Sequence, residues 1–244
     1  MQLREEDVRV PSLDGEIRAV VIAPVGNGRR RPGVLLYTDI FQLTESTLRT
    51  ARRLASSGFV VCVPEIYPHG ELAGVALEFD DAGKAAGQAG AAATPVAQFD
   101  ADRVAVLDYL GARADVDGLC AVGFCIGGHL AFRAAFDPRV AATVCFYPTG
   151  LSDGALGADA DAGSLAAAER IGGRLMIVFG SRDPHVPAPA RLQVVEALYA
   201  AGLTDLELHV FAGGEHAFMR DVGARYDPEL TDLALGTAVA FLRR

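Results

Sequence analysis

The fold of this chain can be predicted outward from one stretch, Leu119-Cys120-Ala121-Val122-Gly123-Phe124-Cys125-Ile126-Gly127-Gly128. Its first five residues form an apolar run without polar alternation, which is typical of a strand buried on both faces of a sheet. A helical pattern follows over 127–136, so Gly123–Gly127 falls in a sharp strand-to-helix turn. A glycine on each side of Cys125 leaves room for neighbouring backbone. The pentapeptide fits the nucleophile-elbow pattern, with cysteine where most such sequences have serine.

The same alternation of strand and helix extends over the whole chain. The other buried runs are Val34–Thr38, Phe59–Pro64, Ala141–Tyr147, Leu175–Gly180 and Glu207–Phe211, and the helix candidates are 45–57, 97–114, 127–136, 189–201 and 229–243. A hairpin of Val8–Pro11 and Ile17–Ala23 around Asp14-Gly15 precedes them. We therefore expect one α/β domain over residues 1–244, a doubly wound, mostly parallel sheet with helices on both faces.

Two stretches rich in glycine and alanine interrupt this alternation. Residues 73–93 carry too few large apolar side chains to hold a core position firmly. They form either a mobile flap over a site or a loosely ordered excursion. Residues 155–168 are similar in composition.

Composition excludes several classes of protein. The chain has 244 residues, of which 51% are hydrophobic and 22% charged, and its net charge is −9. Such a chain is globular rather than disordered, and its acidic surface disfavours nucleic acid and membrane surfaces. The charged N-terminus and the lack of an apolar run of about 18 residues predict a cytoplasmic location. Four cysteines without a C-x-x-C pair predict neither a disulfide framework nor a metal site.

Two later loops supply the base and the orienting carboxylate that a thiol nucleophile needs. Asp183 follows the strand Leu175–Gly180, and His216 follows the strand Glu207–Phe211. Ligands of open α/β sheets bind outside the carboxyl ends of the strands, so these side chains and Cys125 should meet at one rim. The order of nucleophile, acid and histidine along the chain is that of α/β-hydrolases.

An attacked carbonyl also needs two N–H donors for its oxyanion. Ile126, the residue after the nucleophile, supplies one of them. The other belongs to the loop after the strand Val34–Thr38, and we expect it to be Ile40.

Several candidates have plainer interpretations. His129 competes as a base, but the elbow aims Cys125 away from its own helix, so His129 should face the neighbouring layer. His185 and His69 lie in rim loops, as substrate contacts or as ordinary loop histidines, and Asp183 before a proline could simply start a turn. We expect the other cysteines to pack in the core: Cys62, Cys120 and Cys145.

With these residues in place, the sequence resembles the dienelactone hydrolase family of α/β-hydrolases. The likeness rests on segments spread over nearly the whole chain: Asp39-Ile40-Phe41, Val63–Tyr67, Gly123–Gly128, Gly180–Asp183 and Gly214–Phe218. Family members hydrolyse an enol lactone or other small esters through a thioester on the cysteine. The resemblance implies that Cys125 is the nucleophile, His216 the general base and acid, and Asp183 its orienting carboxylate.

The resemblance also suggests contacts around the nucleophile. Asp39 stands where the family has a glutamate that pairs with the resting thiol, although it could equally be a cap or turn residue. Arg220 occupies the place of an arginine that binds the substrate carboxylate, and Lys84 is the only cation offered where a second arginine is expected. Aromatic candidates for an apolar pocket, or else for the core, are Phe41, Tyr67, Phe124 and Phe218.

These observations predict a hydrolase of the carboxymethylenebutenolidase type, without cofactor or metal, acting on a small ester or lactone that carries a carboxylate in some cases. We expect a monomer. A thioesterase or acyltransferase would use the same three residues. The alternatives outside enzymes are a small-ligand receptor and a redox-sensing thiol at Cys125.

Overall fold

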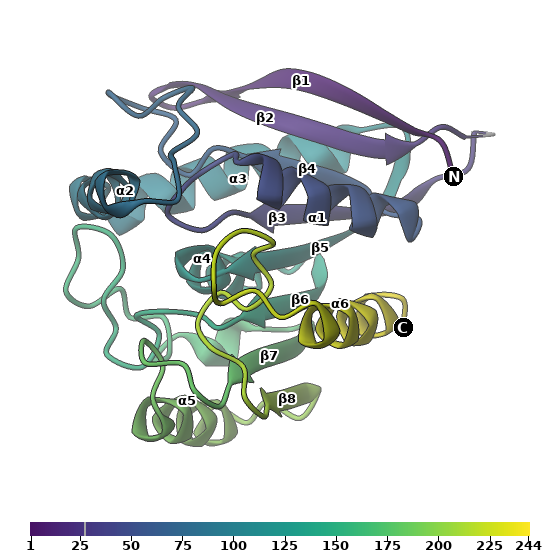
Figure 1. Ribbon diagram of the computed structural model, residues 1–244. Coiled ribbons are helices and arrows are strands. Elements are labelled where there is room, and N and C mark those ends of the chain that lie inside the picture. Colours follow the sequence, from purple (N-terminus) through teal and green to yellow (C-terminus); the bar gives the residue numbers. More distant parts are fainter. Residues whose placement is uncertain (27) are drawn as a thin grey trace.

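Eight strands form one sheet in the computed structural model, which describes residues 1–26 and 28–244 (Figure 1). They are β1 (Leu3–Ser12), β2 (Gly15–Pro24), β3 (Arg31–Tyr37), β4 (Val60–Pro64), β5 (Val116–Phe124), β6 (Val140–Phe146), β7 (Arg174–Gly180) and β8 (Leu206–Phe211). Their order in the sheet is β1-β2-β4-β3-β5-β6-β7-β8. Strands β3 to β8 are mutually parallel, and β2 is antiparallel to β1 and β4. The predicted doubly wound, mostly parallel α/β fold is confirmed.

Helices cover both faces of this sheet. One face carries α1 (Glu45–Ser56) and α6 (Pro228–Leu242), and the other carries α3 (Val96–Ala112), α4 (Ile126–Ala134) and α5 (Ala188–Ala200). These five helices begin and end within two residues of their predicted bounds. A short 3₁₀ helix, η1 (Ala168–Arg170), precedes β7.

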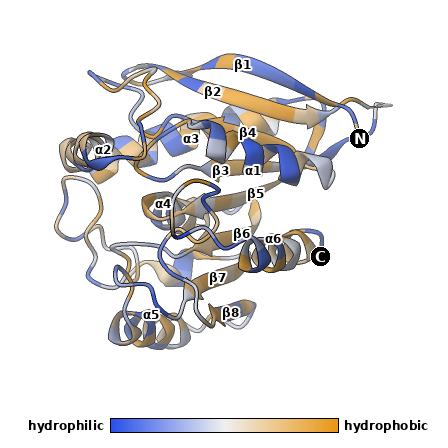
Figure 2. Cartoon of the chain, in the orientation of Figure 1, coloured by the Kyte–Doolittle hydropathy of each residue, from blue (hydrophilic) through white to orange (hydrophobic). Residues whose placement is uncertain are grey.

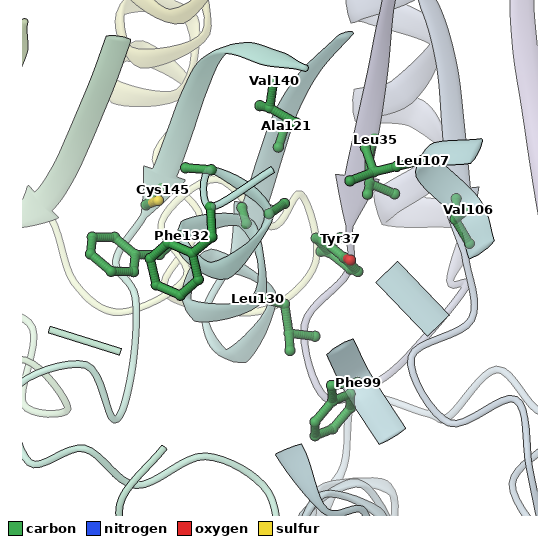
Figure 3. Packing of buried hydrophobic residues seen from close by; sticks show 14 of the residues in the cluster. Leu35, Tyr37, Phe99, Val106, Leu107, Ala121, Leu130, Phe132, Val140 and Cys145 are labelled. Carbon is green, nitrogen blue, oxygen red and sulfur yellow. The ribbon is translucent and has the colours of Figure 1, made fainter. Parts of the chain in front are cut away.

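The side-chain alternation of the strands divides the core into two layers. On β5, Leu119 and Ala121 pack into one hydrophobic cluster, whereas Cys120 and Val122 pack into the other. Figure 3 shows the first cluster, in which Phe132 of α4 points toward the sheet. Burying one large apolar side chain contributes about 1.5–3 kcal/mol, so both layers hold β5 firmly in the middle of the sheet.

The N-terminal hairpin is longer than predicted. β1 pairs with β2 from Leu3 opposite Pro24 to Ser12 opposite Gly15, so β1 begins five residues before the predicted Val8. Figure 2 shows hydrophilic and hydrophobic positions mixed along β1, in contrast to the mostly hydrophobic β2. The first half of β1 forms a strand although it is polar. It lies at the edge of the sheet, where one side of each residue faces water, so its side chains need not be apolar.

Residues 81–93 of the segment 73–93, for which a flap over a site and a loosely ordered excursion were the two alternatives, form the helix α2 (Asp81–Ala93). The carboxylate of Asp80 caps α2 by accepting a hydrogen bond from the N–H of Gly83, at 2.7 Å. A Cβ on Gly87 would lie 2.4 Å from the carbonyl oxygen of Ile40. The small residues therefore allow α2 to approach the loop after β3 closely. Residues 155–168 contain turns and one isolated bridge.

Among the described residues, none of the helices combines the length and apolar character needed to cross a membrane. The same part of the chain contains no cluster of three or more histidine, cysteine or acidic side chains arranged to hold a metal ion.

Candidate active site

Cys125 lies in the turn between β5 and α4, in a backbone conformation with φ 59° and ψ −123°. A positive φ is unusual for a residue with a side chain and marks local strain. A Cβ on Gly123 would lie 1.9 Å from the carbonyl oxygen of Gly127, and a Cβ on Gly127 would lie 2.1 Å from that of Thr38. Neither flanking position can therefore carry a side chain without moving the backbone.

His216 and Asp183 form a buried pair beside this turn. Nδ1 of His216 lies 2.8 Å from Oδ2 of Asp183, and both side chains are almost entirely buried. Oδ1 of Asp183 accepts hydrogen bonds from the backbone N–H groups of His185 at 2.7 Å and Val186 at 3.2 Å. The carboxylate thus keeps its charge and fixes the orientation of the imidazole.

The charges of this cluster favour a protonated His216 ring. Burial alone would lower the pKa of His216, but attraction and hydrogen bonding to Cys125 and Asp183 outweigh it and raise the pKa to about 9. Burial would raise the pKa of Asp183, and His216 together with two backbone N–H groups holds it below its usual value. A ring that keeps its proton at neutral pH is poised to hold a thiolate and to act as an acid.

Cys125 and His216 both line a cavity of about 560 Å³. It lies outside the carboxyl ends of the strands, and α2 forms one wall of it. Its lining includes polar and charged side chains, namely Asp39, Asp80, Asp81, Lys84, Gln88, Thr149, His185, Arg220 and Arg225, and the aromatic rings of Phe41 and Phe79. A cavity of this size accommodates a small organic molecule.

Ile40 and Ile126 also line this cavity. Ile126 is the first residue of α4, so its N–H has no partner within the helix. Within residues 1–26 and 28–244, neither N–H donates a hydrogen bond to a protein acceptor. Neither backbone N–H is therefore committed to a partner among the described residues.

The side chains of Asp39 and Arg220 contact each other. Oδ2 of Asp39 lies 3.6 Å from Nη1 of Arg220, and Oδ1 accepts a hydrogen bond from the N–H of Phe41 at 3.0 Å. Burial raises the pKa of Asp39 in spite of these contacts. The Arg220 guanidinium lies over the rings of Phe41 and Phe79, at 5.0 and 4.7 Å from their centres. Arg220 therefore lies in the cavity wall, where the Asp39 carboxylate balances part of its positive charge.

Three of the aromatic candidates, for which a pocket and the core were the two alternatives, do not line the cavity that Cys125 lines. Phe124 points to the opposite layer, where it stacks on Phe146 at 5.1 Å, because side chains alternate along β5. Phe218 is fully buried, with its ring packed against those of Tyr147 and Phe211. Tyr67 is 2% exposed and lines a neighbouring cavity of about 640 Å³.

His129 is completely buried, and its ring nitrogens contact the carbonyl oxygen of Thr149 and the hydroxyl of Ser164. Thr149 is a cavity residue that the sequence alone did not suggest: its Oγ1 lies 3.8 Å from Sγ of Cys125. The signal that could have found it is its place just after β6, whose carboxyl end meets the same rim. His185, weighed earlier as a loop histidine, lines the cavity with its ring centre 4.5 Å from that of His216.

The strand order, the strained cysteine turn and the histidine–carboxylate pair at the rim define an α/β-hydrolase. The chain belongs to the dienelactone hydrolase family, whose model matches residues 17–244. It is therefore related to hydrolases over almost its entire length.

Individual relatives agree with this assignment. A protein of Saccharomyces cerevisiae named "Putative carboxymethylenebutenolidase" is 34% identical over 212 residues, which cover 84% of this chain and 77% of the relative. A carboxymethylenebutenolidase of Pseudomonas sp. is 27% identical over 218 residues, covering 88% and 85%. A crystal structure described as "Putative Dienelactone Hydrolase" from Klebsiella pneumoniae superposes with a TM-score of 0.88 at 22% identity, covering all of both chains. The last comparison establishes the fold alone.

Proposed function

We propose that this protein hydrolyses a small ester or lactone through a thioester on Cys125. The observation that carries the proposal is the buried pair of His216 and Asp183, which shares one cavity edge with a cysteine held in a strained turn. The carboxymethylenebutenolidase relatives support the same reaction class.

In the first half of the reaction, the Cys125 thiolate attacks the carbonyl carbon and the negative charge moves to the carbonyl oxygen. The N–H groups of Ile126 and Ile40 donate to this oxyanion, and each such donor typically lowers the barrier by about 3 kcal/mol. The tetrahedral intermediate then collapses, the carbon–oxygen bond to the alcohol breaks, and His216 gives its proton to the departing oxygen.

In the second half, the neutral His216 ring takes a proton from water, whose oxygen attacks the thioester carbon. The carbon–sulfur bond breaks and the acid product leaves. Cys125 returns to the thiolate and His216 to the protonated ring, so the resting pair is restored. Asp183 keeps Nδ1 of the ring as a donor throughout.

The cavity suggests a substrate with an apolar part and an anionic part. Phe41 and Phe79 offer an apolar surface, while Arg220, Lys84 and Arg225 supply positive charge around it. Because Asp39 already contacts Arg220, we propose that a substrate carboxylate competes with Asp39 for that guanidinium.

Steady-state hydrolysis of a short aryl ester tests the proposal in the variants Cys125→Ala and His216→Ala. We expect kcat/KM to fall about 10³-fold or more in each, because triad members act as a unit. Cys125→Ser serves as a matched variant that keeps the shape of the nucleophile. Full activity of either alanine variant would refute the proposal.

Product analysis separates hydrolysis from acyl transfer. With an added primary alcohol, a hydrolase releases the free acid, whereas an acyltransferase forms a new ester. Binding of the aryl ester without turnover would instead identify a receptor. Ready formation of sulfenic acid on Cys125 with mild peroxide, together with little turnover, would identify a redox sensor.

A further inference from the structure

We propose that the Thr149 hydroxyl is the hydrogen-bond donor to the Cys125 sulfur in its thiolate form, and that a buried chain starting at Arg133 positions it. The inference rests on the proposed function, in which that thiolate is the nucleophile. It assigns to Thr149 the role of a residue that stabilises the nucleophile before substrate arrives.

Thr149 is attached to Cys125 through both backbone and side chain. Its backbone N–H donates to the carbonyl oxygen of Cys125 at 3.2 Å, and its Oγ1 lies 3.8 Å from Sγ. Within the part of the chain that the structure describes, Oγ1 makes no other hydrogen bond. A hydroxyl facing a thiolate can only donate, because the anion has no proton to give.

A buried row of hydrogen bonds fixes the backbone of Thr149. Its carbonyl oxygen lies 3.1 Å from Nδ1 of His129, and Nε2 of the same ring lies 2.7 Å from Oγ of Ser164. Nη1 of Arg133 donates to that Oγ at 3.0 Å. The Arg133 guanidinium is itself held by the carboxylate of Asp100.

The direction of each bond in this row follows from the donors and acceptors. A carbonyl oxygen only accepts, so Nδ1 of His129 carries the hydrogen. Burial lowers the pKa of His129 to about 4, so Nε2 is unprotonated at neutral pH and accepts from the Ser164 hydroxyl. Ser164 in turn accepts from Arg133. The row therefore runs in one direction, from Arg133 through Ser164 and His129 to the carbonyl oxygen of Thr149, which it holds in place.

Electrostatics explains why such a donor is useful. A hydrogen bond to the charged form of an acid stabilises that form, and hydrogen bonds to ions are roughly twice as strong as neutral ones. The hydroxyl of Thr149 therefore favours the thiolate of Cys125 over the thiol. Valine has nearly the same shape and no donor, which makes Thr149→Val a clean probe.

The other groups that act on the sulfur stay constant in this comparison. The titratable and charged side chains that share the cavity are Asp39, Asp80, Asp81, Lys84, His185, His216, Arg220 and Arg225, with Asp183 behind His216. None of them changes in Thr149→Val or in the control Thr149→Ser. A difference between the two variants therefore reports on the hydroxyl.

The experiment is a pH titration of the ultraviolet thiolate absorption in the whole protein. Burial raises the pKa of Cys120 to about 11 and that of Cys62 to about 12, and it raises the pKa of Cys145 further. The signal of Cys125 is therefore taken as the difference between the titration of the wild type and that of Cys125→Ala. We expect Thr149→Val to move the midpoint up by about one pH unit, and Thr149→Ser to restore it. At pH values below the midpoint, where the thiol predominates, kcat/KM should fall about tenfold in the valine variant alone.

The possible results distinguish a hydrogen-bond role of Thr149 from a packing role, and both from a failure of the proposed function. A wild-type midpoint in Thr149→Val overturns the inference, and so does an equal shift in the valine and serine variants, because packing alone would then explain it. If the valine variant does not fold, Ser164→Ala tests the same row, with a smaller upward shift expected and an unchanged midpoint contradicting the role. Activity that survives in Cys125→Ala refutes the proposed function instead, whatever Thr149 does.

Discussion

At the scale of single residues, the proton on His216 governs what the site can do. Cys125 and Asp183 raise the pKa of His216 from 6.5 to about 9, so the ring is charged at neutral pH and loses its proton as the pH passes about 9. In the proposed reaction, the departing alcohol takes that proton. We therefore expect kcat/KM to decline on the alkaline side with a midpoint near 9, measured as a pH profile for aryl ester hydrolysis.

Asp183→Asn provides the control for this profile. It removes one of the two partners that raise the pKa of His216, so the alkaline decline should begin at lower pH. An alkaline limb that stays in place in the asparagine variant would show that another group sets it.

The sequence places the three residues proposed for catalysis after three strands, and the structure brings them to one edge of the sheet. Their exact contacts could not be predicted. Asp39 could have been a partner of the thiol or a cap or turn residue, and its side chain contacts Arg220 and the N–H of Phe41. The direction in which a loop side chain points depends on neighbours far away in sequence, and no local pattern encodes it.

At the scale of elements, the close contact of α2 with the loop after β3 should matter for both stability and activity. In Gly87→Ala, the new Cβ would meet the carbonyl oxygen of Ile40 at 2.4 Å, so α2 or the loop must shift. We expect the variant to lose about 1–3 kcal/mol in urea unfolding. Because the N–H of Ile40 belongs to the same loop, kcat/KM should fall about tenfold or more.

Gly236→Ala is the matched control, since a Cβ at that position in α6 has no atom within 4 Å. Alanine favours helix by up to about 1 kcal/mol over glycine, so this variant should be as stable as the wild type or more so. Equal stability of the two variants would contradict the steric role of Gly87.

Some strands could be predicted from the sequence more easily than others. Those packed on both faces, such as β5 and β7, appear as continuous apolar runs. The first half of β1 is hidden by its charges, of which Glu5 pairs with Arg52 at 2.6 Å and Glu6 with Arg113 at 3.2 Å. Such ion pairs join segments far apart in the chain, and composition alone does not reveal them.

At the scale of the whole molecule, buried His129 links stability to pH. Its pKa is about 4 in the folded protein and 6.5 without burial, so between these values the unfolded chain binds a proton that the folded chain does not. The free energy of unfolding should therefore fall by up to about 3 kcal/mol as the pH drops from 6.5 to 4. Urea unfolding across this range measures it.

His129→Asn keeps a donor for the carbonyl of Thr149 and cannot titrate, so its stability should depend less steeply on pH in this window. An identical slope in the variant and the wild type would assign the acid sensitivity to other groups.

The burial of Cys62, Cys120 and Cys145 has a practical consequence. A thiol-labelling reagent should modify one sulfur per native molecule and four once the chain is opened by denaturant. Counting labelled sites by mass spectrometry would then report the population of unfolded molecules directly, even in a crude mixture. A reagent that labels Cys125, the proposed nucleophile, would also measure how much of the sheet remains folded.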